Sequence, residues 1–275
     1  LASGAAGYRP VDVRSGAAKT AVGRVVSFAT ALALLFAGPA WAGEVPFAPQ
    51  HTPPLNEDGW QAGTCVNPEC APQDPPAAFY ETAAGHPPFG ITQFIIKHKT
   101  ELTHVEPTVD LKTLRVDLPV GLSVNPGATP QCAAEHPAQC ATQEPLSRVG
   151  ESIVEVSPEA PLLPPVPITA QVYSLVPKPG EPARFGFTVE AVPDLPLLPP
   201  SDIYLEADVA WDSDFHEGFT IDVPKVDLVR LLENRLVFDG LAHVPGHPGF
   251  FLTTPSTCFD PSSGQFAHTY STYAR

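Results

Sequence analysis

The sequence predicts a mainly β protein, and within that class a proline-rich β-sandwich of the immunoglobulin-like or jelly-roll-like kind. First, 35 of the 275 residues are proline, well above the usual share of about 5%, and proline interrupts helices from inside. Second, several segments alternate apolar and polar residues, which is the period of a half-buried strand. Third, turn-forming residues separate these segments, which is typical of sandwiches. An N-terminal signal helix and an extended linker are expected to precede the sandwich.

The charge balance limits the partners that the chain can bind. It has 15 Lys and Arg against 30 Asp and Glu, a formal net charge of −15. Nucleic-acid binding needs a basic surface, so no nucleic-acid partner is expected. The hydrophobic content of 43% is ordinary for a globular protein, which argues against a wholly disordered chain.

Residues 1–42 have the three parts of an export signal. An uncharged apolar run occupies 25–37, and the small residues Ala40 and Ala42 follow it in an Ala-Trp-Ala motif. The basic residues before the run are Arg14, Lys19 and Arg24. A basic flank, a short apolar stretch and a small-residue cleavage site define a secretory signal. The apolar run spans only about 20 Å as a helix, less than the ~30 Å bilayer core. We therefore expect cleavage after Ala42, with an uncleaved anchor or a buried helix as the alternative.

Export permits disulfides, and the chain has five cysteines. Cys65 and Cys70 are close in sequence, as are Cys132 and Cys140, so local pairing is the simplest arrangement. Cys258 is then left over, which means an intermolecular bond, a free thiol or a missing partner. A partner beyond Arg275 is the favoured explanation, so we expect a chain truncated at its C-terminus. Metal binding by the two pairs is the alternative, but neither has the His or Cys neighbours of a zinc site.

The composition changes along the chain. Residues 43–78 are rich in proline and poor in apolar runs, which predicts an extended linker. Residues 79–275 carry the alternating segments and are expected to form one sandwich domain. The expected strands are 89–96, 111–118, 152–156, 168–176, 184–189, 203–211, 219–223 and 235–238. Two Pro-Leu-Leu-Pro-Pro connections between them lack backbone donors, so they are expected to cross between sheets or to run along an edge.

Two segments carry more specific predictions. The segments 168–176 and 184–189 flank a Lys-Pro-Gly-Glu-Pro turn signal, so they are expected to pair as an antiparallel hairpin. Residues 226–236 place leucines at helical spacing but continue into an alternating stretch. Helix and strand are therefore both open for this segment.

An acidic stretch suggests a metal site. Asp208, Asp212, Asp214 and Glu217 lie close together in the sequence, and clustered carboxylates can supply oxygen ligands to Ca²⁺. The spacing matches an EF-hand loop only over its first three positions, so a solvated acidic turn is the alternative. Asp212 and Asp214 also form a possible glycosidase pair, but neighbouring residues of one loop rarely bracket a sugar. No other cofactor is expected.

The histidines and serines form no catalytic pattern. His243 and His247 are four residues apart, but Pro245 and Gly246 between them exclude the helix that a zinc-binding pair needs. The histidines expected at the surface are His98 and His104. The chain contains no G-x-S-x-G, P-loop or G-x-G-x-x-G motif, so no catalytic residue is predicted.

Most aromatic residues are expected in the core rather than on a sugar-binding platform. The residues concerned are Phe94, Phe185, Phe187, Trp211 and Phe238. Trp60 differs because it lies in the expected linker, where it is either exposed or docked on the domain.

Four phrases of the sequence resemble, in the same order, a family of large secreted actinobacterial proteins of uncharacterised function. They are AGHPPF at 84–89, LKTLRVDLPVGLSVNPGATPQC at 111–132, VYSLVPKPGEPARFGF at 172–187 and FFLTTPSTC at 250–258. Val120, Ser123, Val124 and Lys178 depart from the family pattern. The resemblance implies a multi-domain, β-rich exported protein with further β domains and cysteines downstream. It implies no activity.

The sequence favours a non-catalytic secreted or cell-surface module with a structural or adhesive role. The export signal, the proline-rich connections, the cysteine pairs and the lack of a catalytic motif motivate this expectation. Envelope components or carbohydrate are the expected partners, and no membrane span is expected in the mature part. The alternatives are a secreted hydrolase whose site is not recognisable from sequence and a Ca²⁺-dependent binding module.

Overall fold

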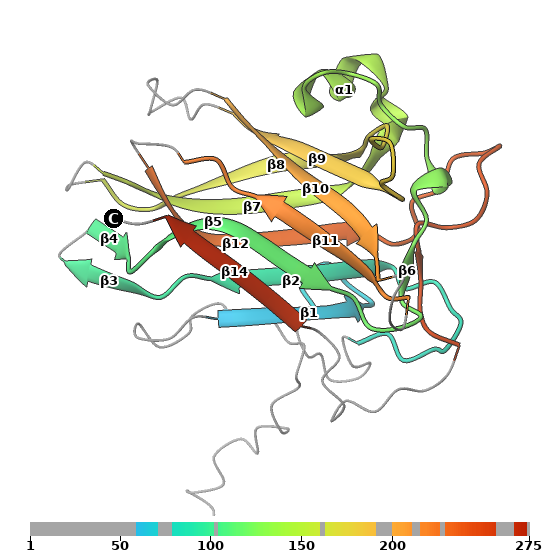
Figure 1. Ribbon diagram of the computed structural model, residues 1–275, viewed down its shortest axis with the longest axis horizontal. Helices are drawn as coiled ribbons and strands as arrows, with labels where there is room; N and C mark the ends of the chain where they lie inside the picture. The colour runs from blue at the N-terminus through green and yellow to red at the C-terminus, as the bar shows by residue number, and fades with distance from the viewer. Residues whose placement is uncertain are drawn as a thin grey trace, which may run out of the picture. The chain divides into compact units, whose positions relative to one another are not determined.

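The computed structural model describes residues 59–70, 79–101, 104–159, 163–190, 200–210, 215–225, 229–256 and 267–273. All of them belong to the unit Glu44–Arg275. Within these residues, ten strands form one antiparallel sheet in the order β1-β2-β12-β7-β8-β9-β10-β11-β5-β14 (Figure 1). The predicted mainly β class is confirmed.

The strands of this sheet are β1 (Gly59–Cys65), β2 (Phe89–Ile95), β5 (Asp110–Asp117), β7 (Arg148–Pro158), β8 (Val166–Ser174), β9 (Arg184–Val189), β10 (Ser201–Val209), β11 (Glu217–Asp222), β12 (Val229–Asp239) and β14 (Ala267–Tyr273). Two small sheets pair β3 (His98–Glu101) with β4 (His104–Pro107), and β6 (Ser123–Val124) with β13 (Leu252–Thr253). The helical elements are η1 (Pro126–Ala128), α1 (Pro137–Gln143) and η2 (Pro145–Ser147).

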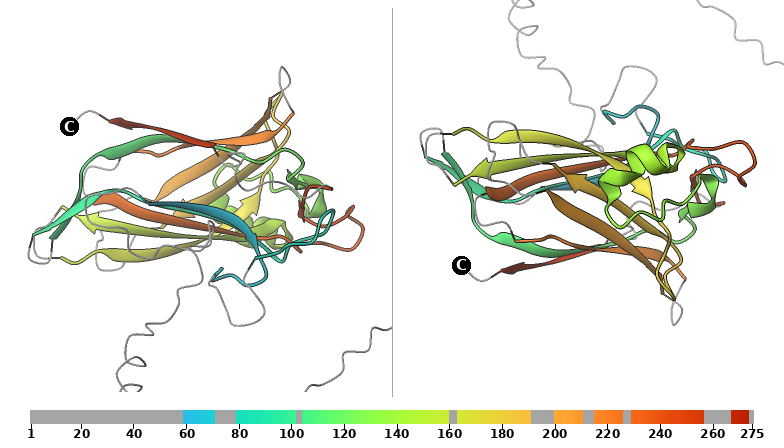
Figure 2. Two further views of the ribbon diagram at one scale, coloured as in Figure 1. Left: turned by 90° about the horizontal axis from the view of Figure 1, so that it is seen from below. Right: turned by 90° about the horizontal axis from the view of Figure 1, so that it is seen from above.

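The ten-stranded sheet curls so that one half faces the other. Figure 2 shows β5 and β14 on one side and β2 and β12 on the other. The bend falls between β8 and β9, whose register pairs are Tyr173 with Gly186 and Ser174 with Phe185. These two segments are the predicted hairpin, and their antiparallel pairing is confirmed. We call the side of the sheet that faces the other half the inner face, and the opposite side the outer face.

The core lies between the two halves because apolar side chains alternate onto the inner face. Strand β10 buries Ile203, Leu205 and Ala207, as the period of a half-buried strand predicts. Phe185 on β9 is fully buried, and its ring centroid lies 5.9 Å from that of Phe219 on β11. The predicted core aromatics Phe94, Phe185, Phe187 and Phe238 all pack in apolar clusters, and Trp211 lies outside the described residues.

The segment 226–236, for which the sequence allowed either a helix or a strand, is a strand where the structure describes it. Residues Val229–Asp239 form β12, which pairs with β2 on one side and with β7 on the other. A helix there would leave backbone N–H and C=O groups of β2 and β7 without partners. The hydrogen bonds between the strands therefore outweigh the weak local preference of the leucine spacing for a helix.

The expected linker contains a strand. Gly59–Cys65 forms β1 and pairs with β2 along its whole length. This segment has no proline, in contrast to the residues around it, so it can donate to a ladder. Ala62 is 2% exposed, and Trp60 packs against a cluster that includes Leu114. Trp60 is therefore docked on the domain.

Both predicted cysteine pairs lie at disulfide distance. The Cα atoms are 5.5 Å apart in Cys65–Cys70 and 5.9 Å apart in Cys132–Cys140. The second disulfide holds α1 against Tyr173 and Leu175 of the sheet, and the first caps the outer face of β2 and β12. Cys258 and the expected signal residues Ala40 and Ala42 lie outside the described residues. No helix in the described ranges has the length and hydrophobicity needed to cross a bilayer.

Candidate functional site

The predicted calcium ligands that the structure describes do not converge. In the register of β10 with β11, Asp208 pairs with Gly218, and Glu217 pairs with Val209. Because successive residues of a strand face opposite sides, Asp208 lies on the outer face and Glu217 on the inner face. Asp212 and Asp214 lie outside the described residues. Where the chain is described, no group of three His, Cys, Asp or Glu side chains is placed to hold a metal ion.

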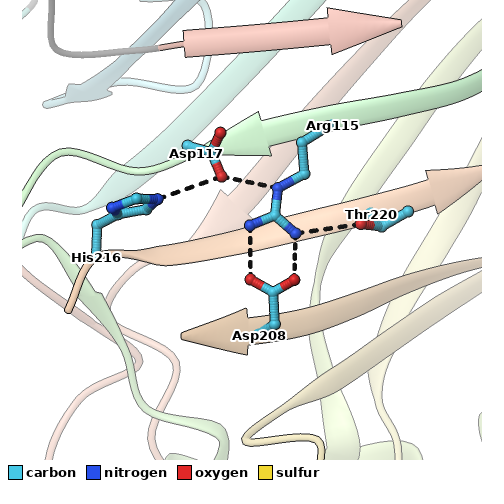
Figure 3. Close-up of polar contacts among 5 residues, drawn as sticks. All are labelled: Arg115, Asp117, Asp208, His216 and Thr220. Atoms are coloured by element: carbon cyan, nitrogen blue, oxygen red, sulfur yellow. Dashed lines mark hydrogen bonds and ion pairs between the residues drawn. The ribbon is translucent and has the colours of Figure 1, made fainter. Parts of the chain in front are cut away.

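Asp208 instead belongs to a cluster centred on Arg115, on the outer face of β5, β11 and β10 (Figure 3). Arg115 forms a two-pronged ion pair with Asp208, in which Nη2 donates to Oδ1 at 2.6 Å. Its Nε donates to Asp117 Oδ1 at 2.7 Å, and its Nη1 donates to Thr220 Oγ1 at 3.2 Å. His216 Nε2 lies 3.5 Å from the same Asp117 oxygen. One guanidinium therefore ties three neighbouring strands together.

The Arg115 cluster holds one guanidinium between two carboxylates. The side chain of Arg115 is 23% exposed. The hydrogen bonds that Arg115 donates to Asp208 raise the pKa of its guanidinium, burial opposes this increase, and Asp117 adds a smaller one. The bare backbone of Gly218 makes room, because a Cβ atom there would lie 2.1 Å from Arg115 Nη2. The N–H groups of Arg115 donate to side chains of β5, β10 and β11, so the cluster links these three strands.

A second set of paired charges lies on β9 and β10. Glu206 binds Lys178 and lies 3.5 Å from Arg184 Nη2. Asp202 lies 2.6 Å from Nδ1 of His136, and this hydrogen bond raises the pKa of the histidine. Opposite charges thus meet in pairs on the outer face.

Glu217 is an acidic residue on the inner face of β11. Its Oε2 accepts a hydrogen bond from the backbone N–H of Val124 at 3.0 Å. Burial raises the pKa of its carboxyl group, and the hydrogen bond from Val124 partly opposes that increase. Glu217, the first residue of β11, therefore links β11 to β6 through this hydrogen bond, and this role explains its burial.

His243 and His247, for which the sequence predicts no metal pair, each contact a backbone carbonyl of a loop. His243 Nδ1 lies 2.9 Å from the carbonyl oxygen of Gly249, and His247 Nδ1 lies 3.0 Å from that of Gly127. A ring nitrogen must donate to each carbonyl. The two rings serve different loops, so the structure does not bring His243 and His247 to one ligand. His98 Nδ1 likewise lies 2.9 Å from a backbone carbonyl.

An open groove lies where β7 begins and β12 ends, and sequence reasoning missed it. Its volume is about 360 Å³, and its lining includes Thr129, Leu146, Arg148, Asp239, Leu241 and His243. Thr129 is 2% exposed, and its hydroxyl has no hydrogen-bond partner among the described residues. Leu146 and Leu241 are 58% and 43% exposed. The groove therefore combines a cation, an anion and a buried hydroxyl with two apolar side chains, and we call it the polar groove.

An apolar cavity lies between the two halves of the sheet. Its volume is about 110 Å³, and its lining includes Val154, Ile168, Phe187, Ile203, Ile221 and Leu231. Alternation along each strand predicted that these side chains are buried. It could not predict a space between them, because that depends on how far apart the two halves lie.

Comparison with protein-family models, curated proteins and solved structures finds no match for this chain.

Proposed function

We propose that the chain is an exported, non-catalytic β-sandwich module with an adhesive or structural role at the cell surface. The observation that carries the proposal is the polar groove, where Arg148 and Asp239 lie beside the exposed apolar side chains of Leu146 and Leu241.

The sandwich part of the proposal is supported by the rings around Phe185. The Phe185 ring centroid on β9 lies 5.6 Å from that of Phe238 on β12 and 5.4 Å from that of Phe251. Strands β9 and β12 belong to different halves of the sheet. Contact between side chains of two inner faces is the arrangement by which sandwiches bury their cores.

A binding role, as opposed to a catalytic one, is supported by how the charges are used. Arg115 is occupied by Asp208 and Asp117, and Glu206 is occupied by Lys178. Catalytic groups instead converge, with shifted pKa values, on a space that holds the substrate. The two disulfides support export, because such bonds persist in oxidising compartments.

The partner we propose is an uncharged carbohydrate of the cell envelope. Arg148 offers donors and Asp239 offers acceptors to hydroxyl groups, and Leu146 and Leu241 offer apolar surface to a sugar ring. The net charge of −15 disfavours anionic polymers, because like charges repel at the surface.

The test measures binding of the full chain to isolated cell envelopes. The protein is sedimented with envelopes from the encoding organism that are untreated, protease-treated or oxidised with periodate. Saturable binding that survives protease and is lost on oxidation is expected. Leu146→Ser and Arg148→Gln weaken that binding, and Leu163→Ser, which changes an exposed leucine outside the groove, leaves it unchanged.

Three results would overturn the proposal. Absence of binding to untreated envelopes excludes the adhesive role, and loss of binding after protease points to a protein partner. Recovery of the protein inside cells with reduced cysteines excludes export. Surface labelling of intact cells, compared with permeabilised cells, measures the last point.

A further inference from the structure

The loop that follows β12 lines the polar groove and also carries an exposed aromatic side chain. This loop, orange-red at the right of Figure 1, projects beyond the end of the sheet. Leu241, near its start, lines the groove, and Phe250, further along it, is 39% exposed. Single exposed apolar side chains are ordinary on a protein surface, whereas a contiguous group of them marks a binding surface.

Phe250 is contiguous with the polar groove through His243. His243 lines the groove, and its ring centroid lies 5.7 Å from that of Phe250. The ring centroid of His86 lies 4.7 Å from that of Phe250. The two imidazole planes are tilted by 59° and 51° against the Phe250 ring, so neither lies flat on it. We call Phe250 and these two histidines the aromatic platform.

The backbone on both sides of Phe250 is fastened to Asn125. Phe251, the next residue, is fully buried, and its carbonyl oxygen accepts a hydrogen bond from the backbone N–H of Asn125 at 2.7 Å. The side chain of Asn125 donates from Nδ2 to the carbonyl oxygen of Pro248 at 2.6 Å. An aromatic side chain whose backbone is held in place before binding loses less conformational entropy when a ligand packs on it.

The two histidines of the platform add hydrogen-bonding atoms beside the Phe250 ring. His86 Nδ1 lies 2.9 Å from the carbonyl oxygen of Leu252, and His243 Nδ1 makes the same contact with Gly249. A ring nitrogen must donate to a carbonyl oxygen, so Nδ1 carries the proton in both rings. Nε2 is then the acceptor of each neutral ring, and it suits a hydroxyl group.

The platform extends the groove by a surface of the same chemistry. The groove pairs apolar side chains with one cation and one anion, and the platform pairs an aromatic ring with two imidazoles. A sugar ring has C–H groups on its faces and hydroxyl groups around its edge. Its face can therefore pack on an aromatic ring while its hydroxyls bond to the polar neighbours.

The position of Phe250 indicates how long the ligand is. The groove, with a volume of about 360 Å³, is lined by Leu241 and His243, and Phe250 lies outside that lining. A single sugar in the groove therefore leaves the Phe250 ring uncovered. The next sugar of a chain can reach the ring, because His243 contacts both the groove and Phe250.

We propose that Phe250 is a recognition residue of the carbohydrate site and that the ligand is an uncharged polysaccharide bound along its length. One sugar lies in the polar groove, and a neighbouring sugar packs on the Phe250 ring. This inference rests on the proposed function, because it names the part of the carbohydrate that the same site binds.

The first test is competition against envelope binding of the full chain. The competitors are oligosaccharides released from the same envelopes by mild acid, passed through an ion exchanger to remove charged fragments, and sorted by length. We expect fragments of several sugars to compete at least about tenfold better than single sugars at equal molar concentration, because only the longer fragments reach Phe250.

The second test changes the ring itself. Phe250→Ala and Phe250→Leu weaken binding of the long fragments by about tenfold, because both remove the aromatic face, whereas Phe250→Trp retains binding. The matched control is Phe215→Ala, since Phe215 is 62% exposed and lies outside the groove and the platform. It leaves binding unchanged. Thermal melting shows which variants are folded.

Three results overturn this inference alone. They are equal competition by single sugars and long fragments, undiminished binding in folded Phe250→Ala, and equal binding by Phe250→Leu and Phe250→Trp. Envelope binding that still depends on Leu146 and Arg148 leaves the proposed function standing in each case. Absence of envelope binding by the unmodified chain overturns the proposed function and this inference together.

Discussion

Truncation of Phe185 to alanine tests whether the two halves of the sheet share one core. Phe185 is fully buried, and its ring contacts Phe219, Phe238 and Phe251 at centroid distances of 5.9, 5.6 and 5.4 Å. A fully buried Phe→Ala change costs about 3–5 kcal/mol, because transfer energy is lost and a cavity remains. The lost ring pairs place this residue near the upper end, since each contributes about 0.5–1.5 kcal/mol.

This loss is large against the total stability of a domain, which is about 5–15 kcal/mol. For a domain of this size, each kcal/mol shifts the melting temperature by about 2–4 °C, so Phe185→Ala lowers Tm by about 10 °C or more. Urea unfolding followed by circular dichroism measures the free energy directly. Phe250→Ala is the control, because Phe250 is 39% exposed and its loss should cost no more than about 1 kcal/mol. If both variants lose the same stability, the two halves do not share the core described above.

Three further predictions concern the clamps of the fold. Arg115→Leu lowers the free energy of unfolding by about 1–2 kcal/mol, because it leaves two carboxylates unpaired, and adding Asp208→Asn restores part of the loss. If urea titrations show that the effects of the two substitutions on the free energy of unfolding simply add, the coupling is contradicted. Burial raises the pKa of Glu217 above 4.5, so the folded state binds the proton more tightly than the unfolded chain does. Stability therefore falls as pH rises from 4.5 through the folded-state pKa, and Glu217→Gln flattens that fall. Urea unfolding curves at several pH values test this prediction. It is contradicted if the stability of Glu217→Gln depends on pH as steeply as the stability of the unmodified chain. Replacing Cys132 and Cys140 by alanine costs about 2–3 kcal/mol, the value for a short closed loop, and equal Tm values for the variant and the unmodified chain would contradict that.

The strands could be predicted from the sequence because burial alternates locally. In β10, one side chain in two is apolar, and those side chains are the buried ones. The cysteine pairs were predictable for a similar reason, since Cys132 and Cys140 are separated by a short loop. Both predictions need only neighbours along the chain.

The candidate sites could not be predicted in this way. Asp208 and Glu217 look like one acidic cluster in the sequence, but the strand register sends them to opposite faces. Arg115 gives no sequence signal of its role, because its partner Asp208 is 93 residues away. In the sequence, the segment Gly59–Cys65 resembles the linker around it. It is a strand because its backbone pairs with β2.

By itself, the sequence determined the class of fold, the position of most strands and the pairing of four cysteines. These follow from the two-residue period of a strand and from the short reach of the chain between near neighbours. Only the tertiary structure decided which charges meet, where β12 and β1 join the sheet, and that a polar groove and an apolar cavity exist. The physical reason is that a curled sheet brings together side chains from distant strands, and no local pattern records how closely two inner faces pack.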